Sequence, residues 1–439
     1  MGSPLGFLGP TRALYLFVLL LSALVAIRHT AARYGHTTSF VPPYLLIQGG
    51  NVTLNNGQSV YADEDFRVDL RYGLDAQHPG PNVTNGPPTA DLLFGAVAVT
   101  TGDYDDPMIY LIGGDAPGID ASSIATHMYN VTSQKYSLFV ADGAPRARCQ
   151  HTAVWSPATR RIFVYGGEDP DNMTHTPMND LCALSLDMGK WDCFHRSIRG
   201  DLPPALRGAS GSMINTTHML LFGGITYSGP VSTSVVYVLN TVDLMWQTVN
   251  PGGDDPPPLV GAAALVLDNS VVFYGNPFGK VEPFTKLYSL YLGNGARTSD
   301  FEWFELTLPA PHPVKATYSA VLVGRFLVST FGYMDQNPEP VRTYDLDNMN
   351  RVTAVDWNNL QDVPPAGFLG FRPRDEGLDG GPIVGIAGGA AIIILGTLLG
   401  FVLYPIYRRN YNSMPFMRQF DVFRSGKPQP VRTDSRQEM

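Results

Sequence analysis

The feature that most constrains this chain is an apolar segment that recurs six times and ends in, or close to, a pair of glycines. The six copies are PYLLIQGG (43–50), MIYLIGG (108–114), RIFVYGG (161–167), HMLLFGG (218–224), SVVFYGN (270–276) and RFLVSTFGY (325–333). A repeat at this spacing indicates one supersecondary unit copied along the chain.

Further apolar stretches complete each unit. One precedes each copy, as in RCQHTAVW (148–155), and a strand, a turn and usually an aromatic residue follow it, as in LCALSLDMGKWDCF (181–194). The 45 Gly and 36 Pro suit many short strands joined by turns. Four antiparallel strands per unit form a propeller blade, and closing a ring buries the apolar faces that one blade exposes. We therefore expect an all-β propeller of six four-stranded blades, or seven if residues 365–371 add a closing strand.

The glycines and tryptophans of the repeat have expected structural roles. Each glycine pair should end its strand where the chain turns sharply, because Gly adopts a positive φ at little cost. Trp191 and Trp246, on the fourth strands, should fill the wedge where neighbouring blades diverge. The glycines concerned are Gly49, Gly50, Gly113, Gly114, Gly166, Gly167, Gly223 and Gly224.

This pattern resembles the kelch repeat over about residues 33–357. Arg33-Tyr34-Gly35-His36 followed by Gly49-Gly50 matches the R-x-G-H and Gly-Gly signature of that family. Arg148, His151, Gly166-Gly167 and Trp191 repeat the order, as do Arg207, Gly208, Gly223-Gly224 and Trp246. The resemblance implies a protein- or glycan-binding propeller, closest to the attractin-like and galactose-oxidase-like kelch proteins.

The galactose-oxidase-like resemblance also implies an alternative, an extracytoplasmic copper oxidase. Such a site takes two Tyr and two His ligands, and His36 and His151 occupy one repeat position. We expect these histidines to be structural instead, donating into the turns of their own blades. The chain has no G-x-S-x-G, P-loop, H-E-x-x-H or G-x-G-x-x-G motif. We therefore expect no catalytic residue, metal or cofactor.

The two ends of the chain predict a membrane protein. Residues 13–27 are apolar after Arg12, so 1–32 is predicted as a signal peptide. Residues 383–404 are uncharged and long enough to span a bilayer. Residues 405–439 form a basic tail, predicted to be cytoplasmic. This predicts a type I single-pass protein of the plasma membrane or a secretory organelle, with an ectodomain at 33–371 and a stalk at 372–382.

Two features of the terminal segments suggest further roles. Gly381, Gly385 and Gly389 recur at the spacing that lets two membrane helices pack closely, which predicts a possible homodimer. Residues 411–414, YNSM, have the form of a tyrosine-type sorting signal. A secretory-pathway sorting or scaffold protein is therefore an alternative function. The net charge of −9 argues against nucleic acid as a partner.

Five N-glycosylation sequons and three long loops bear on where a partner binds. The loops between second and third strands share one end of a propeller with the linkers between blades, which we call the first face. We expect the partner there, on loops 115–125, 168–179 and 225–233. The sequons do not decide between faces, because Asn51, Asn82 and Asn172 are predicted on the first face and Asn130 and Asn215 on the second.

Three cysteines are too few for a disulfide scaffold. If Lys190 pairs opposite Asp187, Cys193 lies opposite Leu184 and diagonal to Cys182. We expect a Cys182–Cys193 disulfide from this proximity and from the oxidising compartment. Cys149 should be a buried free thiol.

Overall fold

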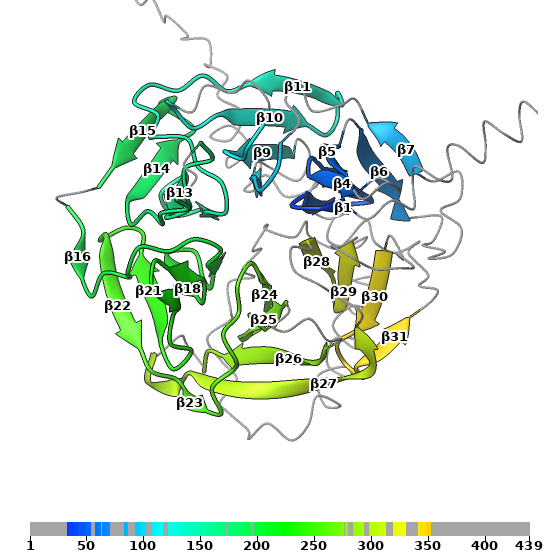
Figure 1. The fold of residues 1–439 in the computed structure, drawn as a ribbon, viewed down its shortest axis with the longest axis vertical. Coiled ribbons are helices and arrows are strands. Elements are labelled where there is room, and N and C mark those ends of the chain that lie inside the picture. Colours follow the sequence, from blue (N-terminus) through cyan, green and yellow to red (C-terminus); the bar gives the residue numbers. More distant parts are fainter. Residues whose placement is uncertain are drawn as a thin grey trace, which may run out of the picture. The chain divides into compact units, whose positions relative to one another are not determined.

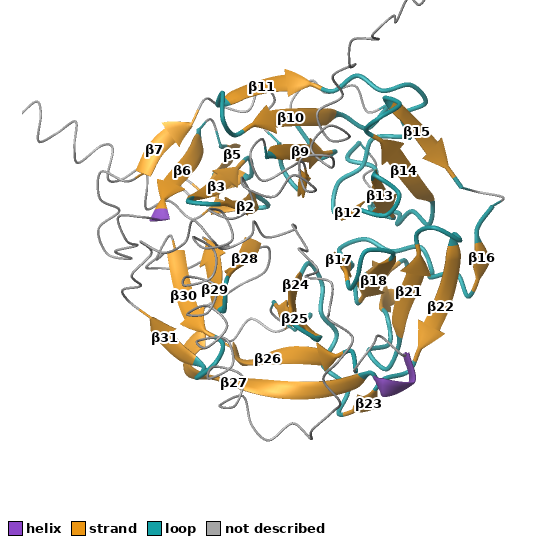
Figure 2. Ribbon diagram, turned by 180° about the vertical axis from the view of Figure 1, so that it is seen from behind, coloured by secondary structure: helices purple, strands orange, loops and turns teal. Residues whose placement is uncertain are grey.

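The chain is built almost entirely from β-strands in a computed structural model (Figures 1 and 2). All the residues described below belong to the unit Met1–Leu378. The structure describes residues 33–352, except for 54–57, 63, 71–82, 87–92, 102–106, 117–121, 172–173, 195–196, 276, 280–283, 294–297, 313–318 and 331–340.

Several predictions concern residues outside this part of the chain. They are the signal peptide at 1–32, the sequons Asn82 and Asn172, the seventh-blade strand at 365–371, the stalk at 372–382, the membrane span at 383–404 and the tail at 405–439. Within the described residues, no helix combines the length and the apolarity needed to cross a membrane.

Six sheets in the described residues each contain four antiparallel strands that follow one another in chain order. The first three sheets consist of β2 (Thr37–Val41), β3 (Tyr44–Gln48), β6 (Asp65–Asp69) and β7 (Val83–Gly86); β8 (Val97–Thr101), β9 (Met108–Ile112), β10 (Thr126–Asn130) and β11 (Lys135–Leu138); and β12 (Thr152–Ser156), β13 (Arg161–Tyr165), β14 (Leu181–Ser185) and β15 (Lys190–Cys193).

The other three sheets follow the same plan. They consist of β17 (Ser210–Met213), β18 (His218–Phe222), β21 (Val236–Asn240) and β22 (Met245–Val249); β24 (Ala263–Leu267), β25 (Ser270–Tyr274), β26 (Phe284–Tyr291) and β27 (Glu302–His312); and β28 (Ser319–Val323), β29 (Phe326–Thr330), β30 (Val341–Asp345) and β31 (Asn350–Val352). A 3-10 turn, η2 (Thr298–Asp300), precedes β27. Every repeated segment predicted to be a strand therefore contains one.

The six sheets are arranged in a closed ring (Figure 1), and their first strands contact one another around it. The neighbouring pairs are β2 and β8, β8 and β12, β12 and β17, β17 and β24, β24 and β28, and β28 and β2. The last pair joins the first sheet to the sixth, and each sheet is built from one continuous stretch of sequence. This arrangement confirms the all-β, propeller-type fold.

The sheets pack face to face through alternating apolar side chains. Phe222 of β18 lies against Phe273 of β25, with ring centroids 5.0 Å apart, and against Trp303 of β27 at 4.9 Å. Its neighbour Leu221 belongs to the core on the other side of the same sheet. Alternation with a period of two therefore gives each sheet two buried faces. Each fully buried large side chain contributes about 1.5–3 kcal/mol.

The glycine pairs connect consecutive sheets as well as ending a strand. Gly166 and Gly167 have φ of 65° and 94°. The N–H of Gly167 donates to the carbonyl of Leu206, in the linker to the next sheet, and a Cβ on Gly166 would clash with that same carbonyl. The eight predicted glycines all have positive φ. The equivalent bonds in the other pairs join Gly50 to Leu93, Gly114 to Arg148 and Gly224 to Leu259.

Both predicted tryptophans are buried between sheets. Trp246 of β22 packs edge-on against Tyr165 of β13 in the preceding sheet, with ring centroids 5.5 Å apart. Trp191 of β15 belongs to a core cluster that includes Tyr110 of β9, also in the preceding sheet. Each indole therefore fills the space where two sheets diverge.

The linkers between sheets add strands that the repeat did not predict. β16 (Arg199–Gly200) pairs in parallel with β22, and β23 (Gly252–Gly253) pairs in parallel with β27. Each linker thereby covers the outer edge of the sheet that it leads into, an edge that would otherwise be open to pairing with another chain.

The first unit also departs from the prediction. The expected strand at 33–41 is divided at Gly35, and β1 (Arg33–Tyr34) pairs with an inserted hairpin of β4 (Asn51–Thr53) and β5 (Ser59–Tyr61). A shorter hairpin, β19 (Ile225–Thr226) and β20 (Gly229–Pro230), follows β18.

Polar side chains join the first sheet to the sixth. The hydroxyl oxygens of Thr38 and Thr330 lie 2.5 Å apart, and Nε2 of His36 lies 2.8 Å from the same Thr330 oxygen. Because Thr330 belongs to β29, these buried contacts hold the two ends of the repeat array together without a shared sheet.

Candidate functional site

A cavity of about 620 Å³ lies among the six inner strands, all of which line it. Phe278 also lines it, from the loop between the second and third strands of the fifth sheet. The lining therefore extends to the first face. The volume is in the range of pockets that bind small molecules or short segments.

Small residues at the start of the inner strands leave this space open. They read GHTT (35–38), GAVA (95–98), QHTA (150–153), GASG (208–211) and GAAA (261–264). Among the described residues of the lining, none is Asp, Glu, Lys, Arg or Tyr. This recurring run was not among the predicted site residues, although the sequence alone shows it.

The first residues of these runs are joined by backbone hydrogen bonds. The N–H of Gly95 donates to the carbonyl of Gly35 at 2.8 Å, and Gln150 donates to Gly95 at 3.2 Å. Gly208 donates to Gln150, and Gly261 to Gly208, both at 2.7 Å. We call this series of five residues the cavity belt. It links five consecutive sheets at the first-face end of the cavity.

Gln150 is the one belt residue with a side chain. Its φ of 53° matches the left-handed conformation of the four belt glycines, which costs a residue with a Cβ about 1–2 kcal/mol. Strain of this kind persists only where the surroundings hold it, and it often marks a functional position.

Two charged side chains hold the Gln150 amide in place. Its Nε2 donates to Oε1 of Glu168 at 2.6 Å, and its Oε1 accepts from Nη1 of Arg207 at 3.2 Å. Oε2 of the buried Glu168 lies 3.4 Å from Nε of Arg207 and 3.1 Å from Nδ1 of His175. A buried carboxylate needs such partners to offset its lost hydration.

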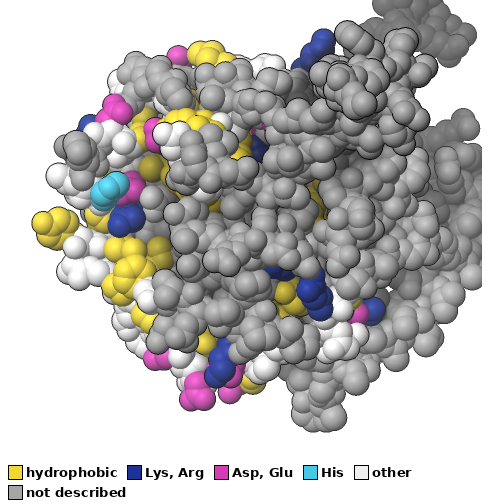
Figure 3. Space-filling model, turned by 45° about the vertical axis from the view of Figure 1, so that its right-hand side comes forward, with side chains coloured by type: hydrophobic (Ala, Val, Ile, Leu, Met, Phe, Trp, Pro, Cys, Tyr) yellow, Lys and Arg dark blue, Asp and Glu magenta, His cyan; other side chains and the backbone are white. Residues whose placement is uncertain are grey.

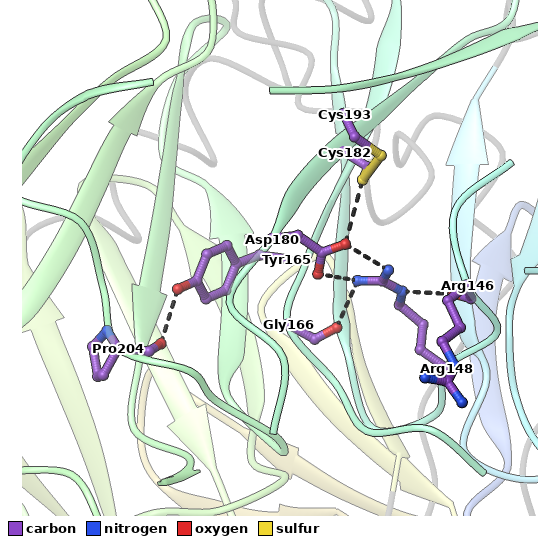
Figure 4. Close-up of polar contacts among 8 residues, drawn as sticks. All are labelled: Arg146, Arg148, Tyr165, Gly166, Asp180, Cys182, Cys193 and Pro204. Atoms are coloured by element: carbon purple, nitrogen blue, oxygen red, sulfur yellow. Dashed lines mark hydrogen bonds and ion pairs between the residues drawn. A yellow bond between two sulfur atoms is a disulfide. The ribbon is translucent and has the colours of Figure 1, made fainter. Parts of the chain in front are cut away.

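Close to Gln150 in the chain, the buried Arg148 forms an ion pair with the partly exposed Asp180 (Figure 4). Nη1 and Nη2 of Arg148 donate to the two carboxylate oxygens of Asp180 at 2.7 and 2.8 Å, and Nη1 also donates to the carbonyl of Gly166 at 3.0 Å. Figure 4 shows the guanidinium between the Asp180 carboxylate and the Arg146 carbonyl. This bidentate pair fixes the segment before β12 to the residue that immediately precedes β14, the third strand of the same sheet.

His36 lines the cavity. Its Nε2 lies beside the Thr330 hydroxyl in the sixth sheet, a partner outside the blade to which the prediction assigned its contacts. Burial, with the nearby Arg33, lowers its pKa to about 3, so the ring is neutral at physiological pH. The prediction failed because the repeat pattern carries no information about which sheet lies beside the first.

His151 also lines the cavity and is 4% exposed. Neither ring nitrogen has a hydrogen-bond partner among the described residues, contrary to the predicted donation into its own blade. Burial, with the nearby Arg148, lowers its pKa to about 3. Two imidazoles without a tyrosine in the described lining do not supply the donor set of the copper-oxidase alternative. We derive no oxidase step.

One cluster of potential metal ligands occurs in the described residues, formed by Asp180, Cys182 and Cys193. A disulfide joins the two cysteines, so their sulfurs are not free thiolates. The predicted register was wrong: Cys193 lies directly opposite Cys182, and Lys190 opposite Ser185. Four residues connect the strands, where the prediction assumed two. Cys149 is buried and free, and burial raises its pKa to about 12.

The first face carries exposed aromatic side chains near the cavity. Tyr227, at the tip of the β19–β20 hairpin, is 85% exposed, and Phe278 is about half exposed. The hairpin is held to the cavity belt region, because Ile225 and Arg207 exchange backbone hydrogen bonds. Figure 3 shows a side of the molecule on which hydrophobic side chains lie among charged groups of both signs.

The predicted partner loops 168–179 and 225–233 thus supply Glu168, His175 and Tyr227 to this region. Of the third predicted partner loop, 115–125, the structure describes residues 115–116 and 122–125. We call the cavity mouth with Gln150, Glu168, Arg207, Tyr227 and Phe278 the first-face site.

The three described sequons differ in their surroundings. Oδ1 of Asn51, in β4, is buried. Oδ1 of Asn215, in the turn between β17 and β18, accepts from the N–H groups of Thr217 and His218, and its side chain is partly exposed. Asn130 closes the turn after β10 by accepting from Ser133, and its Nδ2 lies 3.3 Å from the Met108 sulfur.

Comparison with known families identifies the repeat. The family model described as the KLHDC2/KLHL20/DRC7 Kelch-repeats domain matches residues 95–332, more than half of the chain. The chain therefore belongs to the kelch-repeat family.

Similar proteins come from distant organisms. Tip elongation aberrant protein 1 of Schizosaccharomyces pombe is 25% identical over 197 residues, 44% of this chain and 16% of that protein. Putative adagio-like protein 2 of Oryza sativa subsp. japonica is 28% identical over 270 residues, which are 60% of this chain and 40% of that protein. Rho GTPase-activating protein gacHH of Dictyostelium discoideum is 32% identical over 131 residues, which are 28% of this chain and 8% of that protein. The alignments span less than half the length of each relative.

Proposed function

We propose that this chain is a membrane-anchored, six-bladed kelch propeller that binds a partner protein through the first-face site on the extracytoplasmic side of the membrane. The propeller acts as a non-enzymatic receptor, adhesion or scaffold module. Membership of the kelch family supports a protein-binding role.

The observation that carries the proposal is the solvent-exposed Tyr227, on a hairpin that is hydrogen-bonded to the residue preceding the cavity belt glycine Gly208. A tyrosine that is 85% exposed on a short hairpin gains much apolar contact area when a partner covers it. Tyrosine is among the residues most often found at binding hot spots. The cavity gives the partner a concave feature to fill, and the partly exposed Arg207 and Gln150 supply polar groups close to it.

The placement outside the cytoplasm rests on the sequence. An apolar segment at 13–27, an uncharged segment at 383–404 and a basic tail after it support a type I topology. The Cys182–Cys193 disulfide is compatible with this, because disulfides persist in oxidising compartments.

Photo-cross-linking from either end of the propeller tests the binding proposal. A photoreactive phenylalanine analogue replaces Tyr227 in one full-length protein and Val242 in another. Val242 is a matched control, because it is exposed and lies in the turn between β21 and β22 on the second face. We expect one partner to be captured in cells from position 227 and not from 242. Capture from 242 alone, or capture that depends on residues 408–439, would contradict the proposal.

A further inference from the structure

We propose that the first-face segment 226–234 is a modification site, which carries mucin-type O-linked glycans on Ser228 and Ser232, and that these glycans shield Tyr227. The inference rests on the proposed function, because the modification requires the propeller to lie outside the cytoplasm. It adds a means of regulating the first-face site.

The segment is rich in hydroxylated residues and carries no charge. Five of its nine residues are Ser or Thr, in the order TYSGPVSTS, and Pro230 lies at its centre. No Asp, Glu, Lys or Arg occurs between Gly223 and Val242. A sequence rich in Ser and Thr that contains proline is the composition typical of mucin-type O-glycosylation.

The structure places two of the five hydroxylated residues where an enzyme can reach them. Ser228 and Ser232 are exposed, whereas Thr226, Thr233 and Ser234 are only partly exposed. A glycan is bulky and hydrated, so its acceptor must lie at the surface of the folded protein. Exposure therefore selects Ser228 and Ser232 as the acceptors.

The hydroxyls of both serines contact other hydroxyls of the same segment. Oγ of Ser228 lies 3.0 Å from Oγ1 of Thr226, and Oγ of Ser232 lies 2.8 Å from Oγ of Ser234. The hydroxyl of Ser210 differs, because it is buried and donates at 2.7 Å to the carbonyl of Ala262, at the start of the next sheet. A glycan on Ser228 or Ser232 thus replaces a contact between near neighbours and leaves the contacts between sheets in place.

The segment is fastened at its base and projects as a hairpin. Ile225 and Arg207 exchange backbone hydrogen bonds of 2.9 and 3.1 Å, and the N–H of Val231 donates to the carbonyl of Gly224 at 3.2 Å. Ser228 lies in the turn between β19 and β20, beyond these bonds. The acceptor can therefore be presented without unfolding the propeller.

The modification is a transfer from a nucleotide sugar of the secretory pathway. Oγ of the serine attacks C1 of an N-acetylgalactosamine that is activated as its uridine diphosphate ester. The bond from C1 to the diphosphate oxygen breaks, and uridine diphosphate leaves with the bonding electron pair. A glycosidic bond forms between Oγ and C1, and the hydroxyl proton is released to solvent.

The position of Ser228 gives the modification its consequence. Ser228 follows Tyr227 directly, and the tyrosine side chain is 85% exposed. A glycan on the next residue places a bulky, hydrated group beside the phenol ring, which a partner would have to displace before it could bury that ring. Molecules with and without the glycan should therefore differ in their access to Tyr227.

Mass spectrometry of the full-length chain, produced in cultured mammalian cells, tests the modification. N-linked glycans are removed enzymatically, and peptides that cover 226–234 are fragmented to locate any added sugar. We expect an N-acetylhexosamine on Ser228 and Ser232, and none on these peptides from a Ser228→Ala/Ser232→Ala variant. Peptides without added sugar in the wild type would overturn the inference.

Ser133 is the matched control within the same molecule. It is exposed in the turn between β10 and β11 on the second face, and no proline occurs in that turn or its two strands. We expect no sugar on Ser133. A sugar on Ser133, with Ser228 and Ser232 unmodified, would show that exposure alone directs the modification and would contradict the proposed site.

Limited digestion of the native protein tests the shielding. Chymotrypsin cleaves after exposed aromatic residues, and an exposed loop tip such as that of Tyr227 is a preferred site. We expect cleavage after Tyr227 to be about tenfold slower in the glycosylated wild type than in Ser228→Ala/Ser232→Ala. Ser133→Ala should be cleaved like the wild type, and wild type made in cells blocked in this glycosylation like the double variant. Equal rates for glycosylated wild type and double variant would overturn the shielding.

The same samples separate failure of this inference from failure of the proposed function. An N-linked glycan on Asn215 shows that the chain has entered the secretory pathway. If Asn215 is glycosylated while Ser228 and Ser232 are not, the inference fails and the extracytoplasmic placement stands. If neither kind of glycan is present, the placement fails together with the inference.

Discussion

The amide nitrogen of Gly167 lies 2.8 Å from the carbonyl oxygen of Leu206, which belongs to the linker entering the next sheet. The same contact recurs at the other three glycine pairs. A motif that looks like a local turn signal in the sequence is therefore also an inter-sheet connection. Substituting one of these glycines should therefore lower the free energy of unfolding more than substituting a glycine that only forms a turn.

Replacing Gly166 by alanine should destabilise the protein more than an equal change at Gly189. A Cβ on Gly166 would clash with the Leu206 carbonyl, whereas at Gly189, which also has a positive φ, nothing lies within 4 Å of the added atom. Gly189→Ala should cost about 1 kcal/mol of unfolding free energy, and Gly166→Ala about 3 kcal/mol or more. Urea titrations followed by tryptophan fluorescence measure both. Equal costs would show that the inter-sheet contact is not needed.

The buried histidines predict a loss of stability below pH 6.5. Both have a folded-state pKa of about 3, against 6.5 when exposed, so the unfolded chain binds more protons between these values. The contribution of these histidines to the free energy of unfolding is therefore fully present above pH 6.5, and it is lost as the pH falls toward 3. Each histidine should remove about 1 kcal/mol between pH 7.5 and 5.5.

Substitution of His151 isolates one of these contributions. His151→Phe should reduce the difference between urea-derived stabilities at pH 7.5 and 5.5 by about 1 kcal/mol. Ile162→Val, a core change without a titrating group, should leave that difference unchanged. An unaltered difference in His151→Phe would mean that this ring is protonated in the folded protein.

The disulfide predicts a simple thiol count. The unfolded but unreduced full-length chain should react with one equivalent of an alkylating reagent, at Cys149, and with three after reduction. Mass spectrometry of labelled peptides identifies the positions. Three labelled cysteines before reduction, in protein made in a secretory pathway, would refute both the bridge and its assumed compartment.

Glycosylation should distinguish Asn215 from Asn51. Both side chains are partly exposed, but Asn215 lies in a turn, whereas Asn51 lies within strand β4 and its Oδ1 is buried, which leaves less room for a glycan on the neighbouring Nδ2. In a eukaryotic secretory host, Asn215→Gln should remove one glycan from the mature protein and Asn51→Gln none. Gel mobility before and after glycosidase treatment reports both. A glycan carried at Asn51 in the folded protein would contradict this prediction.

Much of the fold follows from local sequence, whereas the site depends on contacts between units. Segments such as RIFVYGG predict strand β13 and its terminal turn because alternation and glycine conformation are local properties. The Cys182–Cys193 register was misjudged because it depends on the length of one turn. The partners of Gln150 and His36 lie in other loops or in a distant unit, and no spacing rule connects them. The sequence alone shows a glutamine where the equivalent positions of the cavity belt carry glycine. The role of that position depends on the hydrogen bonds of the belt, which the sequence does not show.

The most direct test of the central claim is the affinity of the captured partner for three full-length proteins. Wild type is compared with Tyr227→Ala on the first face and Val242→Ala on the second. If the first-face site binds the partner, Tyr227→Ala should weaken binding by about tenfold or more, and Val242→Ala should bind like wild type. Unchanged binding by Tyr227→Ala together with weakened binding by Val242→Ala would place the interface on the opposite face and contradict the account.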